Sequence, residues 1–392
     1  MSAETRGTAR DRPVPKFFPR SLFFPLFCLS LFFSSGTLSF AQRQETLPWW
    51  YILEQGKFYF RGGEYGHALL SFEDARRQRR AMYEQMERDF IDFLSLPEVR
   101  RLGDSLDRIE TYAAERSYDN VSALLAELYY RIPRESFSDS ASAALGVLGG
   151  LKDYPEAEYW IGETYRTEGE LGLALSQFRK AYELRGLFEN PGSDLDILYK
   201  IADICKIRQE YNEMERTLLL ILGQDTLWSE ESGSFAKNAM IRTLENEGIN
   251  RFLSLYRYNN TAVEEAHRLL GFYYYASGRH SRAEEHLMFS FLIQNTVILE
   301  ELIRREYDYE FTGLRALSDE INRNSLLSDY ASKTEYYRTI YYLGTSLFGT
   351  GKAGPARDFW NFLAACGEAG EWQNRARAQL SGPRVDRAVE MP

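Results

Sequence analysis

The chain has 392 residues, of which 57 are Asp or Glu and 47 are Lys or Arg, and its net charge at pH 7 is −10. This acidic balance argues against nucleic acid as a partner, because nucleic-acid binding needs clustered Lys and Arg to displace counterions. It also argues against attachment to an anionic lipid surface by charge alone. Three cysteines in a chain of this length are too few for a disulfide framework.

The first 41 residues have the pattern of a secretion signal. Basic residues precede an apolar run at 22–33, which is too short to cross a bilayer and is interrupted by Pro25. Small residues at the two positions that a signal peptidase reads predict cleavage after Ala41. Removal of this segment, with its net charge of +3, takes the chain from −10 to −13. The alternative is an uncleaved anchor. In both cases the bulk of the chain is exported, and we expect no membrane span in the mature chain.

A spacing of small, large, small, large and small residues recurs four times after the signal. The four sets are Gly56, Tyr59, Ala68, Phe72 and Ala75; Gly162, Tyr165, Ala174, Phe178 and Ala181; Gly271, Tyr274, Ala283, Leu287 and Ser290; and Gly344, Leu347, Ala356, Trp360 and Leu363. The first two members of each set lie one helical turn apart, and the last three lie on one face of a second helix. The spacing therefore predicts pairs of helices that touch closely at the small residues. Polar turns at 61–64, 167–170, 277–279 and 349–352 join the helices of each pair.

This pattern resembles the tetratricopeptide repeat, a helix-turn-helix unit of roughly 34 residues. The resemblance implies an all-α fold in which such units stack into a right-handed superhelical solenoid. Weaker copies at 202–221 and 240–256 keep most of the spacing, the second with Lys237 where a small residue is expected. With these copies, residues 155–297 are expected to form one continuous array.

The remaining segments are assigned in chain order. We expect the signal at 1–41, a first unit with an extended second helix at 42–96, a degenerate helical segment at 97–154, the tandem array at 155–297, a helical insertion at 298–336, a last unit at 337–380 and a disordered tail at 381–392. Within and beside the insertion, helices are expected at 297–307 and 314–327. Cys205 takes the place of a large packing residue, which predicts a buried free thiol, and a bridge to Cys366 would have to join different repeats.

The sequence contains little that points to catalysis or to a bound metal. His280, Glu284 and His286 are close together, but their spacing fits no zinc motif, and we expect them to be solvated. Other polar groups expected at the surface are His67 and His267, which should be partly exposed, and the acidic pairs at 230–231 and 264–265, which read as solvated helix starts. We therefore expect no enzymatic activity, no metal and no cofactor.

The resemblance also implies a binding surface, since the first helix of each unit lines the concave face of such a solenoid. The residues expected on this face are Trp50, Leu53, Lys57, Phe60, Tyr159, Glu163, Arg166, Tyr199, Arg268, Phe272, Tyr275, Tyr337 and Tyr341. The set mixes aromatic rings with charges of both signs, and Tyr, Trp and Arg dominate binding hot spots. Many of the 26 tyrosines are nevertheless expected to pack between helices.

The family also contains a subfamily that grips C-terminal carboxylates with Lys and Asn on this face. Leu53, Tyr159 and Tyr199 stand where such a Lys would be, which argues against binding of chaperone tails.

These features favour a non-catalytic scaffold or adaptor in the bacterial periplasm that binds a protein partner along its concave face. The chain is similar to periplasmic tetratricopeptide proteins of spirochaetes, which implies an envelope or periplasmic-flagellum assembly. The alternative is an accessory protein of outer-membrane assembly or transport that binds a small apolar ligand between helices, a hypothesis motivated by the apolar clusters at 273–275 and 289–292. A cell-wall enzyme would need a separate catalytic domain, and no stretch is long and different enough to be one. The oligomeric state is left open.

Overall fold

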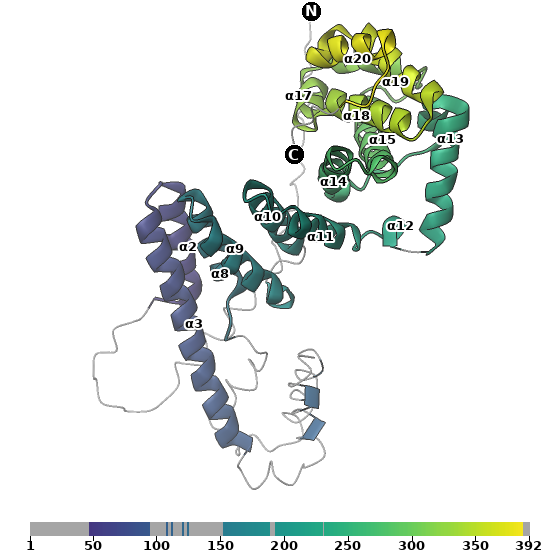
Figure 1. The fold of residues 1–392 in the computed structure, drawn as a ribbon. Helices are drawn as coiled ribbons and strands as arrows, with labels where there is room; N and C mark the ends of the chain where they lie inside the picture. Colours follow the sequence, from purple (N-terminus) through teal and green to yellow (C-terminus); the bar gives the residue numbers. More distant parts are fainter. Residues whose placement is uncertain are drawn as a thin grey trace, which may run out of the picture. The chain divides into compact units, whose positions relative to one another are not determined.

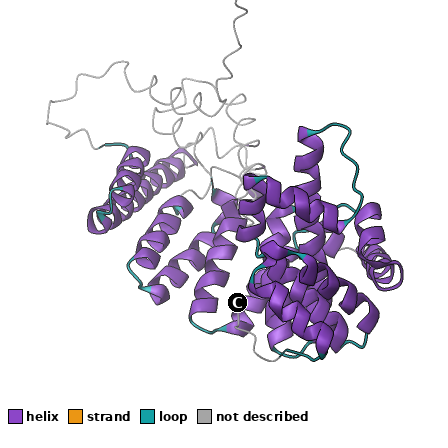
Figure 2. Cartoon of the chain, turned by 90° about the horizontal axis from the view of Figure 1, so that it is seen from above, coloured by secondary structure: helices purple, strands orange, loops and turns teal. Residues whose placement is uncertain are grey.

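The computed structural model describes residues 47–94, 107–108, 111–112, 120, 124, 152–188, 193–229 and 231–386. All regular elements in these ranges are helices, and none of the described residues lies in a strand (Figure 2). This confirms the expected all-α class. The expected signal and nearly all of the degenerate segment at 97–154 lie outside the described residues.

The chain divides into two compact units, one made of residues 1–58 and 73–153 and the other of residues 59–72 and 154–392. The first copy of the repeat supplies α2 (Trp49–Arg61) and α3 (Tyr65–Leu94), and α3 has 30 residues. The helices that follow are α8 (Pro155–Thr167), α9 (Leu171–Glu183), η4 (Arg185–Leu187), α10 (Ser193–Ile207), α11 (Tyr211–Leu222), α12 (Thr226–Ser229), α13 (Glu231–Leu255), η5 (Thr261–Val263), α14 (Glu264–Ala276), α15 (His280–Arg305), α16 (Leu314–Arg323), α17 (Ser325–Lys333), α18 (Tyr336–Gly349), α19 (Ala353–Ala365), η6 (Gly367–Ala369) and α20 (Glu371–Ser381).

The turn between paired helices has the same geometry in five places. The residue seven positions after the first small residue of each copy has a positive φ: Gly63 (77°), Gly169 (86°), Gln209 (60°), Gly278 (75°) and Gly351 (87°). In each turn the N–H of this residue donates to the carbonyl three residues earlier, and the next N–H donates to the carbonyl five residues before it. Such bonds satisfy the last carbonyls of a helix and favour glycine at the left-handed position. The repeated spacing thus corresponds to a repeated local structure.

Gln209 is the one member of this set that is not glycine, and it is exposed. A residue with a side chain costs roughly 1–2 kcal/mol in the left-handed region. Glycine avoids this cost, but it loses more conformational entropy on folding, which offsets part of the gain. We therefore expect Gln209→Gly to raise the free energy of unfolding by about 1 kcal/mol. Urea denaturation followed by circular dichroism measures this change. The matched control is Gly169→Ala, which introduces the same strain and should lower stability, and equal effects of both substitutions would contradict the argument.

The small and large residues of the pattern meet as the spacing predicts. An ideal Cβ placed on Gly162 would lie 3.0 Å from the Phe178 ring, and one on Gly271 would lie 2.5 Å from Leu287 Cγ. A Cβ on Gly344 would lie 3.0 Å from Trp360 Nε1. The large residues in these three pairs are fully buried. Glycine is needed at these positions because the second helix leaves no space for a side chain.

In the unit that contains residues 154–392, consecutive helices of the series α8, α9, α10, α11, α14, α15, α18, α19 and α20 pack against each other (Figure 1). The weak copy at 240–256 does not take its expected place in this series, because α11 packs directly against α14 while α13 packs against α15 and α19. Gly248 breaks α13 with φ 82° and ψ 175°, and Lys237 extends over the ring of Trp228 at 4.3 Å. Residues 155–297 are therefore not one uninterrupted series of stacked pairs.

The segment around the expected insertion also differs in detail. The helix expected at 297–307 is the last part of α15, and the helix expected at 314–327 is divided into α16 and α17 at Asn324, whose side chain accepts a bond from Leu326 N–H. α15 is long and apolar enough to span a membrane, and it is the one such helix among the described residues. Because 78% of its most apolar window is buried within the protein, it packs as a core helix.

Both cysteines of the described residues are free and buried, which confirms the expectation for Cys205. Burial raises the pKa of the Cys205 thiol to about 11. Cys366 Sγ lies 3.4 Å from Ser318 Oγ. Since the thiolate is the reactive form, Cys205 is held in its unreactive state.

Candidate functional site

The expected concave-face residues of α2 differ in exposure. Trp50 is 49% exposed and Leu53 is buried. Lys57 forms an ion pair with Glu54 at 2.7 Å. Phe60, which belongs to the unit of residues 59–72 and 154–392, is half-buried. Its ring lies edge-on to that of Trp160, with ring centroids 5.4 Å apart. Of these four residues, Trp50 offers the largest exposed apolar surface.

The expected residues of α8 and α10 form a polar network. The Tyr159 hydroxyl donates to Asp196 at 2.6 Å, and the buried Glu163 carboxylate pairs with Arg166 at 2.9 Å and with Lys200 at 3.4 Å. Desolvation, and then the bond to Asp196, raises the pKa of Tyr159. The charged groups of this network are therefore already paired with each other within the protein.

Tyr199 has a structural role. Its hydroxyl donates to the Ala262 carbonyl at 2.6 Å and accepts from the Ala266 N–H at 3.3 Å, which ties α10 to the start of α14.

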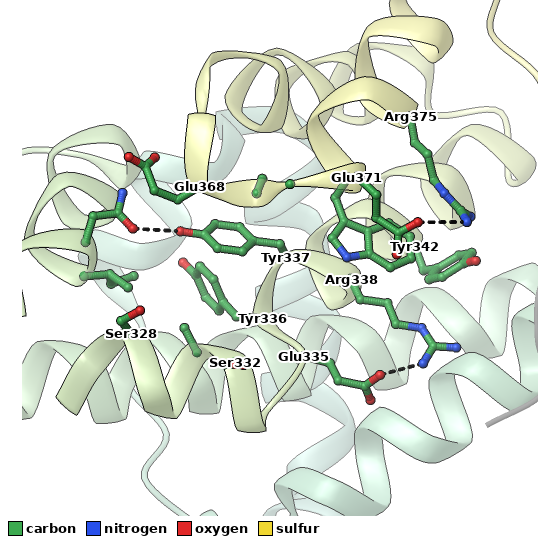
Figure 3. A pocket seen from close by; sticks show the side chains of 16 residues that line it. Ser328, Ser332, Glu335, Tyr336, Tyr337, Arg338, Tyr342, Glu368, Glu371 and Arg375 are labelled. Atoms are coloured by element: carbon green, nitrogen blue, oxygen red, sulfur yellow. Dashed lines mark hydrogen bonds and ion pairs between the residues drawn. The ribbon is translucent and has the colours of Figure 1, made fainter. Parts of the chain in front are cut away.

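A cavity of about 1100 Å³ lies in the C-terminal part of the unit that contains residues 154–392 (Figure 3). It is open to solvent on one side and is lined by residues of α16, α17, α18, η6 and α20. Tyr337, one of the expected site residues, lines it and donates to Asn322 Oδ1 at 3.4 Å. Ser328, Ser332 and Glu368 add polar groups to the wall.

The charged group at the α18 end of the cavity centres on Glu335. Its carboxylate pairs with Arg338 at 2.5 Å, as Figure 3 shows, and with Arg268. Glu335 has φ 49° and ψ 42°, a left-handed conformation that is costly for a side chain other than Gly, Asn or Asp. Arg338 also lies over the Phe272 ring at 4.4 Å. The two arginines hold this strained residue at the cavity wall.

The opposite wall comes from α20. Arg375 lies over the Trp372 ring at 4.8 Å and pairs with Glu371 at 3.2 Å. Tyr342 of α18 lies beside Trp372, with ring centroids 5.7 Å apart. Sequence reasoning missed Arg338, Trp372 and Arg375. The Trp-x-x-Arg spacing of α20 was a usable signal, since residues three apart share a helix face.

The structure brings the C-terminal members of the expected set together around this cavity. Tyr337 lines it, and Arg268 and Phe272 support Glu335 and Arg338. Tyr275 packs against Tyr342 at 4.9 Å, and Tyr341 against Trp372 at 5.4 Å. Four of these residues lie beneath the side chains that line the cavity, since each is at most 8% exposed: Arg268, Phe272, Tyr275 and Tyr341.

Two expectations about exposed histidines were wrong. His267 is fully buried and His286 is 3% exposed, and their Nδ1 atoms lie 3.1 Å apart. Trp228 of α12 covers both rings, with centroids at 4.9 and 4.7 Å. Burial lowers the pKa of both imidazoles, that of His286 to about 3. The sequence did not reveal this enclosure because Trp228 lies outside the repeat pattern. His67 is exposed, as expected.

Glu264 is also not the solvated residue that was expected. It is 6% exposed and accepts bonds from Ser290 and Gln294, each at 2.8 Å, beside Arg268 at 3.4 Å. Burial raises the pKa of its carboxyl group.

At the cavity wall, Glu335 pairs with Arg338, Glu371 pairs with Arg375, and the Tyr337 hydroxyl donates to Asn322 Oδ1. Among the residues that the structure describes, no group of three or more His, Cys, Asp or Glu is placed to hold a metal ion. The apolar clusters at 273–275 and 289–292 do not line the cavity, since their aromatic and leucine side chains fill the core.

Comparison with known proteins gives relatives without an assigned role. No protein-family model matches the chain. A protein of Treponema pallidum (strain Nichols), described as uncharacterized, is 26% identical over 337 residues, which cover 85% of this chain and 89% of that protein. A protein of Borreliella burgdorferi (strain ATCC 35210 / DSM 4680 / CIP 102532 / B31), also described as uncharacterized, is 21% identical over 214 residues, which cover 50% of this chain and 66% of that protein. The chain is thus similar over most of its length to a protein of one spirochaete and over half of it to a protein of another.

Proposed function

We propose that the protein is an exported scaffold of the tetratricopeptide type that binds a segment of another protein and has no catalytic activity of its own. The observation that carries this proposal is the turn that recurs with the same hydrogen bonds within every clear copy of the spacing, between its two helices. The proposal includes stacking of these units into a solenoid. In such arrays the first helices of successive units supply the binding surface.

The cavity beside α18 is the proposed contact site for the partner. Its wall combines Tyr337, Trp372, Arg338 and Arg375. Large aromatic residues and arginine dominate protein-binding hot spots because they bury much area and make directed bonds. The ion pairs with Glu335 and Glu371 hold the two guanidinium groups in place and so reduce the entropy lost on binding.

The proposed location is the periplasm, within an envelope or periplasmic-flagellum assembly. The support for it is the signal-like pattern of the first 41 residues and the acidic body that follows them. Similar chains in two spirochaetes are consistent with such a setting. No structural observation favours the alternative of a small apolar ligand, since the clusters that motivated it pack in the core.

The test is cross-linking in cells with a tagged full-length chain, followed by mass spectrometry of the recovered proteins. We expect one envelope protein to be recovered, and we expect Tyr337→Ala combined with Trp372→Ala to lower its recovery about tenfold or more, because hot-spot truncations typically cost 2 kcal/mol or more. The matched control is Tyr307→Ala, which removes the same side chain at a position that is 97% exposed and does not line the cavity.

The two variants must have the helicity of the wild-type protein for the comparison to count. Equal recovery with the cavity variant and the Tyr307→Ala control would contradict the assignment of the contact site. Failure to recover any envelope protein with the wild-type chain would contradict the scaffold role itself.

A further inference from the structure

The C-terminal segment, defined as residues 382–386, turns back after α20 and lies against the protein. Pro383 cannot continue the helix, and the chain leaves α20 at Ser381. The Arg384 N–H then donates to Gln379 Oε1 at 2.9 Å, and Val385 packs partly buried against the core. The segment was expected to be part of a disordered tail, and as far as Asp386 this was wrong. Residues 387–392 lie outside the described residues.

Asp386 is bound by side chains from three helices. The Tyr341 hydroxyl of α18 donates to its carboxylate at 3.0 Å, and the Tyr275 hydroxyl of α14 donates to its main-chain carbonyl at 2.9 Å. The Arg375 guanidinium of α20 lies 3.9 Å from the same carboxylate. Gln379 donates to the Tyr341 hydroxyl at 3.1 Å and orients it. These groups together recognise a carboxylate and the carbonyl of the same residue, which is the chemistry of an acidic residue in an extended segment.

This carboxylate site adjoins the cavity. Arg375 contacts Asp386 and also lines the cavity, and Tyr342 lines the cavity while packing against both Tyr275 and Tyr341. Tyr275 and Tyr341 are also two of the residues that the sequence assigns to partner contact. The segment that contacts them here is the chain's own. It follows α20, so it can leave without unfolding any helix that the structure describes.

We propose that Tyr275, Tyr341 and Arg375 form a binding site for an Asp or Glu side chain of an extended partner segment, and that residues 382–386 occupy this site as an internal competitor. The inference rests on the proposed function, since the partner segment is the one that enters the adjoining cavity. A tethered competitor has an effective concentration in the millimolar range, so it weakens binding of a free segment that has the same contacts.

The test uses a fluorescently labelled synthetic peptide of residues 382–392 and the full chain, with binding followed by anisotropy. We expect the full-length Asp386→Ala variant to bind the peptide about tenfold or more tightly than the wild-type chain, because its own segment no longer competes. The matched control, Asp308→Ala, removes an exposed carboxylate after α15 and should behave as wild type. A peptide with Ala in place of Asp386 should bind the Asp386→Ala chain several-fold more weakly than the natural peptide.

A second variant separates recognition from stability. Tyr341→Phe in the Asp386→Ala background keeps the ring and removes one donor, so peptide binding should weaken several-fold while the thermal unfolding midpoint stays close to that of the parent. Equal binding of the peptide by the wild-type and Asp386→Ala chains, or no binding by either, overturns the inference. The cross-linking experiment measures recovery of the partner by the wild-type chain. If a partner is recovered there but the peptide experiment gives either of these results, the carboxylate site is contradicted and the scaffold role is not.

Discussion

Replacement of Phe178 by alanine is expected to lower the free energy of unfolding by about 3–5 kcal/mol, which is the usual cost of removing a buried aromatic side chain. Phe178 is fully buried, touches the position where Gly162 would carry a Cβ, and lies edge-on to Tyr159 with ring centroids 5.7 Å apart. Gly162 has no side chain that could fill the space left by the Phe178 ring, so the substitution leaves an empty space between the two helices. Urea denaturation followed by circular dichroism gives the free energy.

The matched control is Leu173→Ala on the same helix. Leu173 is 50% exposed, so its truncation should change the free energy by no more than about 0.5 kcal/mol. Amide hydrogen exchange should show the loss of protection from Phe178→Ala first in α8 and α9, because stacked repeats contact mainly their neighbours. Similar losses from the two substitutions would mean that Phe178 does not join these helices.

The buried histidine pair predicts a steep loss of stability in mild acid. Burial lowers the pKa of His267 and of His286 below the ordinary value of 6.5, so the unfolded chain takes up two protons that the folded chain does not. Stability is therefore complete above pH 6.5 and is lost as the pH falls toward 3. Between pH 7 and pH 5 the two groups together should cost about 4 kcal/mol. Urea denaturation at both pH values measures the change.

The pH effect must be separated from that of other groups. The raised pKa of Glu264 acts in the opposite direction, because this carboxyl group takes up its proton in the folded chain at a higher pH than in the unfolded chain. The control is His267→Gln combined with His286→Gln, which cannot titrate and leaves Glu264 in place. Wild type should lose about 4 kcal/mol more than this variant between pH 7 and pH 5. The same pH dependence in both proteins would show that the imidazoles do not carry the effect.

The repeat pattern predicted local structure well, because each of its members has a packing role that depends on residues close in sequence. Gly162 and Phe178, Gly271 and Leu287, and Gly344 and Trp360 meet as the spacing requires. The same logic placed Cys205 in the core. It was less successful where a copy had lost its small residue. Lys237 stands at such a position, and α13 packs against α15 and α19 instead of between α11 and α14.

The candidate site was predictable only in part. Tyr337 and the residues behind it were found because they lie at fixed positions in the first helix of a unit. Arg338, Trp372 and Arg375 were missed, as were the contacts of Asp386, because they arise between α18, α20 and residues 382–386. The burial of His267 and His286 was missed for a similar reason, because Trp228, which covers both rings, comes from a helix outside the repeat pattern.

The spacing of small and large residues was enough to predict the all-α class, the helix pairs, the polar turns between them and the residues at which paired helices touch. These follow from the helical period and from the absence of a side chain on glycine, both of which act over a few turns of one hairpin. Only the packing of the whole fold shows which helices leave the series, which histidines and carboxylates become buried, and where residues 382–386 bind. Those outcomes depend on desolvation and on bonds between residues far apart in the chain, such as Asp386 with Tyr275 and Tyr341, and the spacing of residues within one helix pair carries no information about them.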